Sequence, residues 1–129
     1  DPETEVVLPR IDSDLFDLFE GVANQTLNEK FFSVSDKIAT TVMLVSGGYP
    51  EAYQKNKEIT GFDSVSESIV YHAGTVIKDD KVVTSGGRVM AITSFGDTIQ
   101  DALTKSYHSI DKINFEKMNY RKDIGFDLI

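Results

Sequence analysis

The stretch VVTSGGRVMAIT, residues 82–93, joins two runs of strand-forming residues through a break. Both runs are rich in valine, isoleucine and threonine, which is typical of β-strands. The break is Ser85-Gly86-Gly87, and the second run restarts on an arginine, Arg88. One interpretation is a bulge or turn with a surface ion pair beside it. The other is a backbone opened by glycine so that an anion can bind to Arg88, and the residues alone favour the first.

Further strands are expected on the amino-terminal side of this stretch. KIATTVMLVS, residues 37–46, is rich in β-branched residues and ends at the turn formers of residues 47–50, GGYP. A loop with a short strand around Ile59 follows. Residues 68–78, SIVYHAGTVIK, form a second strand region broken at Gly74, and Asp79-Asp80 predicts a hairpin turn into residues 81–84.

A helix is expected on the carboxy-terminal side, after Gly96. Asp97, with Gln100 three residues later, forms a variant of the capping box. The apolar stripe of this helix is Ile99, Ala102, Leu103, Ile110 and Ile113. The tail beyond it is irregular.

The amino-terminal part is expected to be separate from the sheet. Pro2 and Pro9 favour an extended chain over residues 1–10, and Asp12 or Ser13 would then cap a helix. Its apolar face is formed by Leu15, Leu18, Phe19, Val22 and Ala23. We place the boundary of the main unit near Phe31. The expected fold is therefore α+β, with an N-terminal helix, a mostly antiparallel sheet and a late helix.

Composition limits the classes of function. The chain has 129 residues, no cysteine and a formal net charge of −8, so we expect no thiolate chemistry and no binding of nucleic acid, which needs a basic surface. We also expect no membrane partner, because no apolar run approaches the roughly 20 residues of a membrane span. The first residue is Asp1 rather than methionine, which we interpret as the sign of a piece from a longer protein.

Motifs for catalysis are missing from the sequence. There is no nucleophile elbow and no phosphate-binding loop of the G-x-x-x-x-G-K-[ST] type. The two histidines, His72 and His108, are far apart and lack the spacing of metal ligands. We expect His72 to make a structural hydrogen bond in a strand and His108 to lie on a helix surface.

Five short motifs, taken together, carry a resemblance to a known family. DPETEVVLPR, MLVSGGYPEAYQKNKEITGF, YHAGT, VVTSGGRVMAITSFGDTIQDA and YRKDIGF occur in this order. In this order they resemble the carboxy-terminal part of the phosphoribosylamine–glycine ligase (glycinamide ribonucleotide synthetase) family. The resemblance covers nearly all of the chain and is weakest over residues 24–36. The family consists of ATP-grasp ligases of de novo purine synthesis, which join glycine to phosphoribosylamine while converting ATP to ADP.

The resemblance implies a division of labour between this chain and a larger enzyme. In the family, Mg²⁺ (or Mn²⁺) is held by a Glu-x-Asn motif just upstream of the residues matched here. We therefore expect the ATP-binding lobes, the metal ligands and the catalytic residues to lie outside this chain, which alone would be inactive and bind no cofactor. Residues 1–30 would be the end of the ATP-grasp domain. Residues 31–129 would be a substrate-side domain with a barrel-like sheet similar to that of biotin carboxylase, in a cytoplasmic enzyme.

The resemblance also implies roles for individual residues. Arg88 stands where related enzymes contact the phosphate of the ribonucleotide, here phosphoribosylamine or glycinamide ribonucleotide, and Gly86 and Gly87 would give access to it. Asp1 stands where an acidic residue lies near the substrate amine. The pair Gly47-Gly48 and the run Arg121-Lys122-Asp123 fit the same cleft, with a structural role as an equal alternative.

Two residues depart from the family pattern. Asn56 stands where the family often has glycine, and asparagine tolerates the same left-handed backbone. Ser85 replaces a common asparagine.

The alternative function is a non-catalytic module of the same enzyme, which packs against the ATP-grasp body or a second copy and binds nothing. The missing ATP-grasp lobes are the expected partner in both cases.

Overall fold

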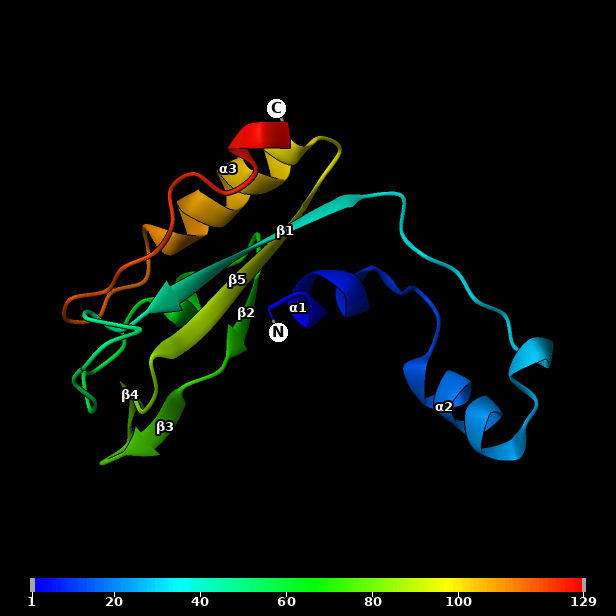
Figure 1. Cartoon of the computed structure of the whole chain (residues 1–129), viewed down its shortest axis with the longest axis horizontal. Helices are drawn as coiled ribbons and strands as arrows, with labels where there is room; N and C mark the ends of the chain where they lie inside the picture. The colour runs from blue at the N-terminus through cyan, green and yellow to red at the C-terminus, as the bar shows by residue number, and fades with distance from the viewer. Residues whose placement is uncertain (1, 129) are drawn as a thin grey trace.

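The fold is built on a three-stranded antiparallel sheet, and the computed structural model describes residues 2–128. The strand order is β1–β5–β2, so that the longest strand is central. The strands of this sheet are β1 (Ile38–Val45), β2 (Ile69–His72) and β5 (Arg88–Gly96). A separate hairpin pairs β3 (Thr75–Lys78) with β4 (Lys81–Thr84). Figure 1 shows the helix α3 (Ile99–Ile110) lying across one face of the sheet.

The core lies between this sheet and α3. In β1, residues at even positions from Thr40 to Leu44 are buried and odd positions are partly exposed, as expected for a strand with one covered face. Val42 and Leu44 pair with Ile92 and Met90 of β5. With Ile110 of α3, these side chains are fully buried.

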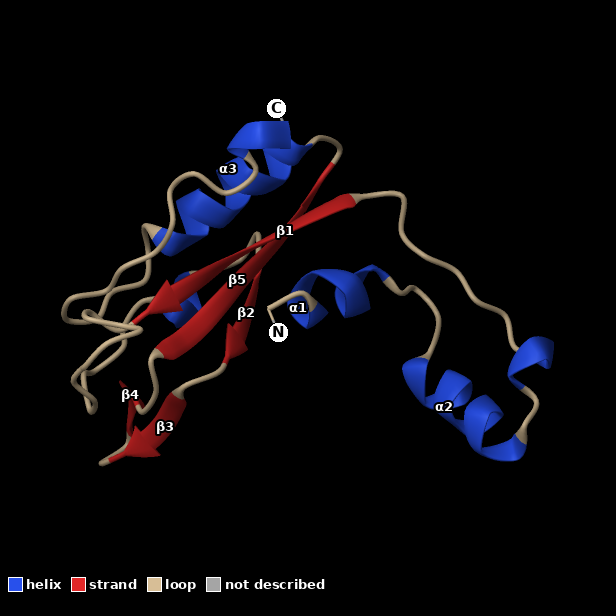
Figure 2. Cartoon of the chain, in the orientation of Figure 1, coloured by secondary structure: helices blue, strands red, loops and turns tan. Residues whose placement is uncertain are grey.

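The fold class is therefore α+β with antiparallel pairing and a late helix, as predicted. The sheet is not closed into a barrel, because β1 and β2 are both edge strands and the β3–β4 hairpin is a sheet of its own (Figure 2). The hairpin turn falls on Asp79 and Asp80, as predicted. Both have positive φ, 52° and 58°, which is the requirement of a type I′ turn. Asn56 also has a positive φ, 59°, so it adopts the left-handed conformation expected of it.

Hydroxyl groups fill part of the interface between α3 and the sheet, which the apolar pattern of the helix did not predict. Ser106 of α3 is fully buried and hydrogen-bonds Ser94 of β5 at 2.8 Å and Thr40 of β1 at 3.2 Å. Ser109 and Ser94 both hydrogen-bond Ser68, at 2.6 and 2.7 Å. Because each buried hydroxyl has a partner, the cluster fixes how the helix sits on the sheet without a large desolvation cost.

The start of α3 corrects the predicted cap. The N-cap is Thr98, whose side chain accepts a hydrogen bond from the Asp101 amide at 3.1 Å. Asp97 lies one residue before it and its amide donates to the Asp101 carboxylate at 3.2 Å. Asp97 lies in the bend between the strand, which ends at Gly96, and the N-cap Thr98.

Replacing Thr98 with alanine should remove this cap. We expect the free energy of unfolding to fall by about 1 kcal/mol, measured by urea denaturation of the chain. Thr104→Ala is the matched control, since Thr104 is an exposed threonine inside the same helix and alanine is favourable there. Equal losses in the two variants would contradict the capping role of Thr98.

The amino-terminal segment differs most from expectation. Residues 1–10 were expected to be extended, but the described part forms the short helix α1 (Thr4–Val7) and a 3₁₀ turn, η1 (Leu8–Arg10). Pro9 is compatible with this turn because it lies in its first positions, where no helical hydrogen bond is needed. α1 packs on β1 and β5, and the Thr93 hydroxyl donates to the Glu5 carbonyl at 2.9 Å.

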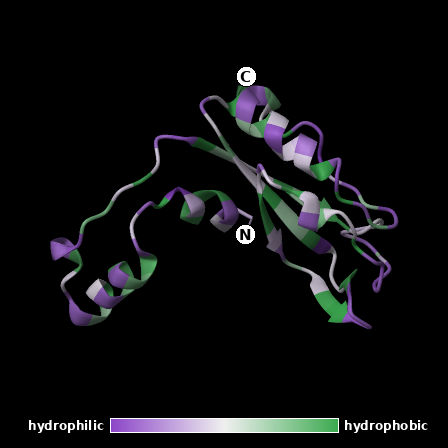
Figure 3. Cartoon of the chain, turned by 180° about the vertical axis from the view of Figure 1, so that it is seen from behind, coloured by the Kyte–Doolittle hydropathy of each residue, from purple (hydrophilic) through white to green (hydrophobic). Residues whose placement is uncertain are grey.

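The helix α2 (Leu15–Asn24) is capped by Asp14, rather than by Asp12 or Ser13, through a 2.8 Å hydrogen bond from the Phe16 amide. It packs mainly against the 3₁₀ turn η2 (Leu27–Glu29) and lies away from the sheet (Figure 1). Of its predicted apolar face, only Leu18 is buried. Figure 3 shows that α2, although it lies away from the sheet, carries hydrophobic residues.

Candidate functional site: a groove that contains Arg88

A β-bulge decides where Arg88 points. Leu44 of β1 pairs with Met90 of β5, yet the next residue, Val45, pairs with Arg88. Val89 is therefore an extra residue in β5, opposite no residue of β1. This is the geometry of a β-bulge, which changes the direction of the side chains beyond it.

The consequence is a change of face. In an unbroken strand, residues 88, 90 and 92 would lie on the same side, and Arg88 would point into the core with Met90 and Ile92. The extra residue instead places Arg88 opposite Val45, on the face of β1 that also carries Met43. The arginine is exposed, while Val89 takes the buried position next to Met90. A bulge is thus present, at Val89 rather than within Ser85-Gly86-Gly87, and it brings Arg88 to the outer face of the sheet.

Glycines make this bulge possible through close packing. A Cβ atom on Gly74 would lie 2.3 Å from the Arg88 carbonyl oxygen, and one on Gly87 would lie 2.1 Å from the Tyr49 ring. The Gly74 amide donates to the Arg88 carbonyl at 2.8 Å, and the Gly86 amide donates to the Gly74 carbonyl at 3.2 Å. The Ser46 amide and hydroxyl donate to the carbonyls of Gly87 and Gly86. The glycines therefore bring three backbone segments and a tyrosine together around Arg88.

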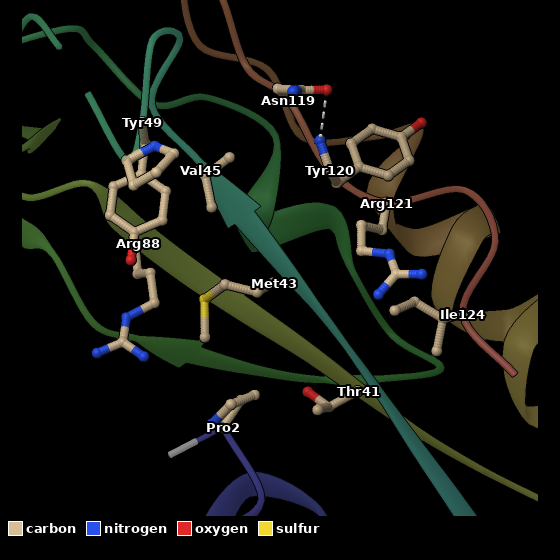
Figure 4. Close-up of a pocket in the computed structure, with 11 residues that line it drawn as sticks. Pro2, Thr41, Met43, Val45, Tyr49, Arg88, Asn119, Tyr120, Arg121 and Ile124 are labelled. Carbon is tan, nitrogen blue, oxygen red and sulfur yellow. Dashed lines mark hydrogen bonds between the residues drawn. The ribbon is translucent and has the colours of Figure 1, made fainter. Parts of the chain in front are cut away.

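Arg88 lies in a groove of about 570 Å³ on this outer face (Figure 4). Its floor is the outward side of β1, its walls are a turn after β1 and the C-terminal segment, and its lower edge is the start of the chain. The lining residues are Pro2, Thr41, Met43, Val45, Tyr49, Pro50, Arg88, Asn119, Tyr120, Arg121 and Ile124. The lining is largely apolar, and among residues 2–128 its charged side chains are the two arginines.

The second arginine of the groove, Arg121, is held by an acidic neighbour. Its Nε and Nη2 donate to the two carboxylate oxygens of Asp123 at 2.9 and 2.8 Å. This hydrogen bonding holds the pKa of Asp123 below its ordinary value and raises the pKa of Arg121. Of the predicted run, Arg121 lines the groove, whereas Lys122 lies 5.9 Å from the centre of the Tyr120 ring and does not line it.

The other residues singled out in the sequence lie elsewhere. Asp1 is outside the described residues. Gly48 has a φ of 95° and belongs to the turn after β1. His72 shares a 3.0 Å hydrogen bond with Thr75, as expected of a structural histidine, and His108 is exposed on α3. Tyr49, Met43 and Tyr120 are groove residues that the sequence did not indicate, although the alternation of β1 places Met43 on the outer face.

Within residues 2–128, no group of three or more histidine, aspartate or glutamate side chains is arranged to hold a metal ion. None of the helices in this part of the chain is both long enough and apolar enough to cross a membrane.

The α+β fold of this chain is also found in a known protein. The crystal structure of phosphoribosylamine–glycine ligase from Thermotoga maritima superposes with a TM-score of 0.75 at 33% identity, over 95% of this chain and 30% of that one. The phosphoribosylamine–glycine ligase of Caldanaerobacter subterraneus subsp. tengcongensis is 44% identical over 125 residues. The trifunctional purine biosynthetic protein adenosine-3 of Gallus gallus is 42% identical over 132 residues, which cover all of this chain and 13% of that protein.

Residues 39–127 match the family described as phosphoribosylglycinamide synthetase, C domain. The chain belongs to this family. The match with the Caldanaerobacter ligase includes 97% of this chain but only 30% of the length of that ligase. The resemblance carried by the five sequence motifs is thereby confirmed.

Proposed function

We propose that this chain is the substrate-side, carboxy-terminal part of a phosphoribosylamine–glycine ligase, and that its groove binds the phosphate end of the ribonucleotide. The observation that carries the proposal is the bulge at Val89, which brings a guanidinium group to an open groove instead of the core. A guanidinium matches the geometry of a phosphate and can donate two parallel hydrogen bonds to it. The family membership makes phosphoribosylamine and glycinamide ribonucleotide the ligands that fit.

Arg88 positions the substrate in this account and does not touch the reacting carboxylate. Fixing the phosphate end orients the distant amine, which is a contribution of proximity and orientation. The Gly86-Gly87 turn supplies the shape of the phosphate end, because it lets the Tyr49 ring pack beside Arg88. On the family resemblance, ATP and Mg²⁺ (or Mn²⁺) would be bound by the remaining lobes of the polypeptide.

The proposal predicts how activity divides between the parts. This chain alone should release no ADP from ATP in the presence of phosphoribosylamine and glycine, whereas the polypeptide that joins it to the ATP-grasp lobes should. The ATP-grasp lobes without this chain should still bind ATP. Their rate of ADP release should be a small fraction of the rate of the joined polypeptide. The measurement is a coupled ADP assay, and turnover by the isolated chain would contradict the assignment.

We also propose that residues 1–30 belong structurally to the ATP-grasp body, with the boundary near Phe31. The supporting observation is an apolar surface on α2 and its neighbours, with a hollow of about 410 Å³. The hollow is lined by Leu8, Ile11, Leu15, Leu18, Phe19, Val22, Leu27, Lys30 and Phe32. An apolar patch of this kind on an otherwise acidic chain fits a protein interface better than open solvent.

A charge placed on this surface should lower the stability of the protein only when the interface is formed. Phe19 is 64% exposed in this chain, so Phe19→Glu should change the stability of the isolated chain by no more than about 0.5 kcal/mol. In the joined polypeptide, the same change would bury a charge and should lower the free energy of unfolding by about 2 kcal/mol or more.

The matched control is Phe126→Glu. Phe126 is equally exposed, at 69%, but lies in the C-terminal 3₁₀ turn outside this surface. Its replacement should be neutral in both contexts. Thermal or urea unfolding of both variants in both contexts decides the question, and equal behaviour of the two would count against an interface at α2.

A further inference from the structure

We propose that Arg121 is a second ligand-binding residue of the groove, which contacts an oxygen of the sugar part of the ligand and is positioned by Asp123. This inference rests on the proposed function, because it assigns the far end of the same groove. Figure 4 shows Arg88 and Arg121 on opposite sides of the groove, with Met43 of the floor between them. A ligand that spans them needs a phosphate at one end and an acceptor oxygen at the other, as a phosphorylated sugar has.

The ion pair with Asp123 leaves Arg121 able to donate further hydrogen bonds. A guanidinium carries five N–H donors in one plane. Asp123 accepts from two of them, one on Nε and one on Nη2, so three are not used by this carboxylate. The two-point contact fixes the plane of the guanidinium, which reduces the side-chain entropy that ligand binding would otherwise have to overcome.

The backbone that carries Arg121 is tied to the sheet and to α3. Asn119 exchanges two hydrogen bonds with Val45 of β1, at 2.8 and 3.0 Å. The Tyr107 hydroxyl of α3 donates to the Arg121 carbonyl at 3.1 Å. The segment is therefore anchored immediately before Arg121 and at Arg121 itself, which is how a binding residue on an irregular segment is kept in place.

Electrostatics favour an anionic ligand at this point. The chain has a net charge of −8, yet within residues 2–128 the charged side chains that line this groove are both arginines. Thr41 and Met43 between them carry no charge. Asp123, beside the groove, offsets the charge of Arg121, so what the two ends of the groove offer an anionic ligand is the N–H donors of two guanidinium groups.

Titration of the chain with two probes separates the two ends of the groove. Ribose 5-phosphate would engage both arginines, whereas inorganic phosphate would engage Arg88 alone. Arg121→Gln should therefore weaken ribose 5-phosphate about five- to tenfold, the effect of one or two hydrogen bonds, and should leave the affinity for inorganic phosphate within about twofold. Arg88→Gln should weaken both probes. Calorimetry or amide chemical shifts give the dissociation constants.

Two further variants complete the test. Lys122→Gln removes the same charge one residue away from Arg121 and outside the groove, so it should change the affinity by less than about twofold. Asp123→Asn should weaken ribose 5-phosphate by a smaller factor than Arg121→Gln, because Arg121 remains but is held less firmly. Tighter binding in Asp123→Asn would overturn the positioning role of Asp123.

The outcomes distinguish a failure of this inference from a failure of the proposed function on which it rests. If Arg88→Gln weakens ribose 5-phosphate but Arg121→Gln behaves like Lys122→Gln, the role of Arg121 is overturned and the proposed phosphate site stands. If the unaltered chain binds neither probe, the groove is not a phosphate site, and the role of Arg121 is overturned with it. Amide spectra of each variant verify that the fold is kept.

Discussion

In the proposed ligase polypeptide, replacing Arg88 with glutamine should raise the KM for phosphoribosylamine about 10- to 100-fold. Hydrogen bonds to a charged group contribute about 1.5–3 kcal/mol, and each 1.4 kcal/mol is a factor of ten in affinity. The KM for ATP should stay within about twofold, because Arg88 lies in a groove of this domain and the proposed function assigns ATP to other lobes. Steady-state kinetics with each substrate varied in turn measure both constants.

Arg88→Lys is the matched control for this prediction. Lysine keeps the positive charge but cannot donate two parallel hydrogen bonds to one phosphate. We expect an intermediate KM for phosphoribosylamine, between the values of the original enzyme and the glutamine variant. If the glutamine variant instead has unchanged kinetics and a lowered thermal stability, Arg88 acts in packing, and the alternative of a non-catalytic module is supported.

Replacing Gly74 with alanine should destabilise the chain by about 1–3 kcal/mol, the usual range for inserting a methyl group where none fits. The new Cβ would lie 2.3 Å from the Arg88 carbonyl oxygen and 2.8 Å from the Gly86 Cα. Because both are backbone atoms, the strand segments must separate. This separation would weaken the 2.8 Å hydrogen bond from the Gly74 amide to the Arg88 carbonyl.

Gly86→Ala is the comparison for this effect. A Cβ at Gly86 would lie 3.1 Å from the Gly74 Cα, a contact that a small backbone shift relieves. Urea denaturation should therefore show a smaller loss of stability than in Gly74→Ala. The Gly74 variant should also bind ribose 5-phosphate more weakly, since the bulge that directs Arg88 is disturbed. A Gly74 variant as stable as the Gly86 variant would show that the bulge tolerates the extra methyl group.

Much of the sheet and the late helix follows from local patterns in the sequence. The β-branched run before Gly47 and the Asp79-Asp80 turn each determine their own structure through side-chain alternation and backbone preference. The caps were placed a residue or two early, at Asp97 instead of Thr98, because several adjacent residues can cap a helix. Residues 4–7 form a helical turn that packs on β1 and β5, a tertiary contact that the prolines do not reveal.

The site was only partly predictable. Arg88 was singled out by the glycines before it, but the direction of its side chain depends on the register between β5 and β1, which a single sequence does not contain. Arg121 is 33 residues away, and its place in the same groove depends on the pairing of Asn119 with Val45. Tyr49 joins the groove because Gly87 leaves room for its ring.

The most direct test of this account is a crystal structure of the ligase polypeptide that contains this chain, with glycinamide ribonucleotide bound. The account predicts that the phosphate of the ribonucleotide lies within hydrogen-bonding distance of the Arg88 guanidinium, in the groove over Met43. A ribonucleotide bound with its phosphate elsewhere, and with Arg88 making no contact to it, would contradict the central claim.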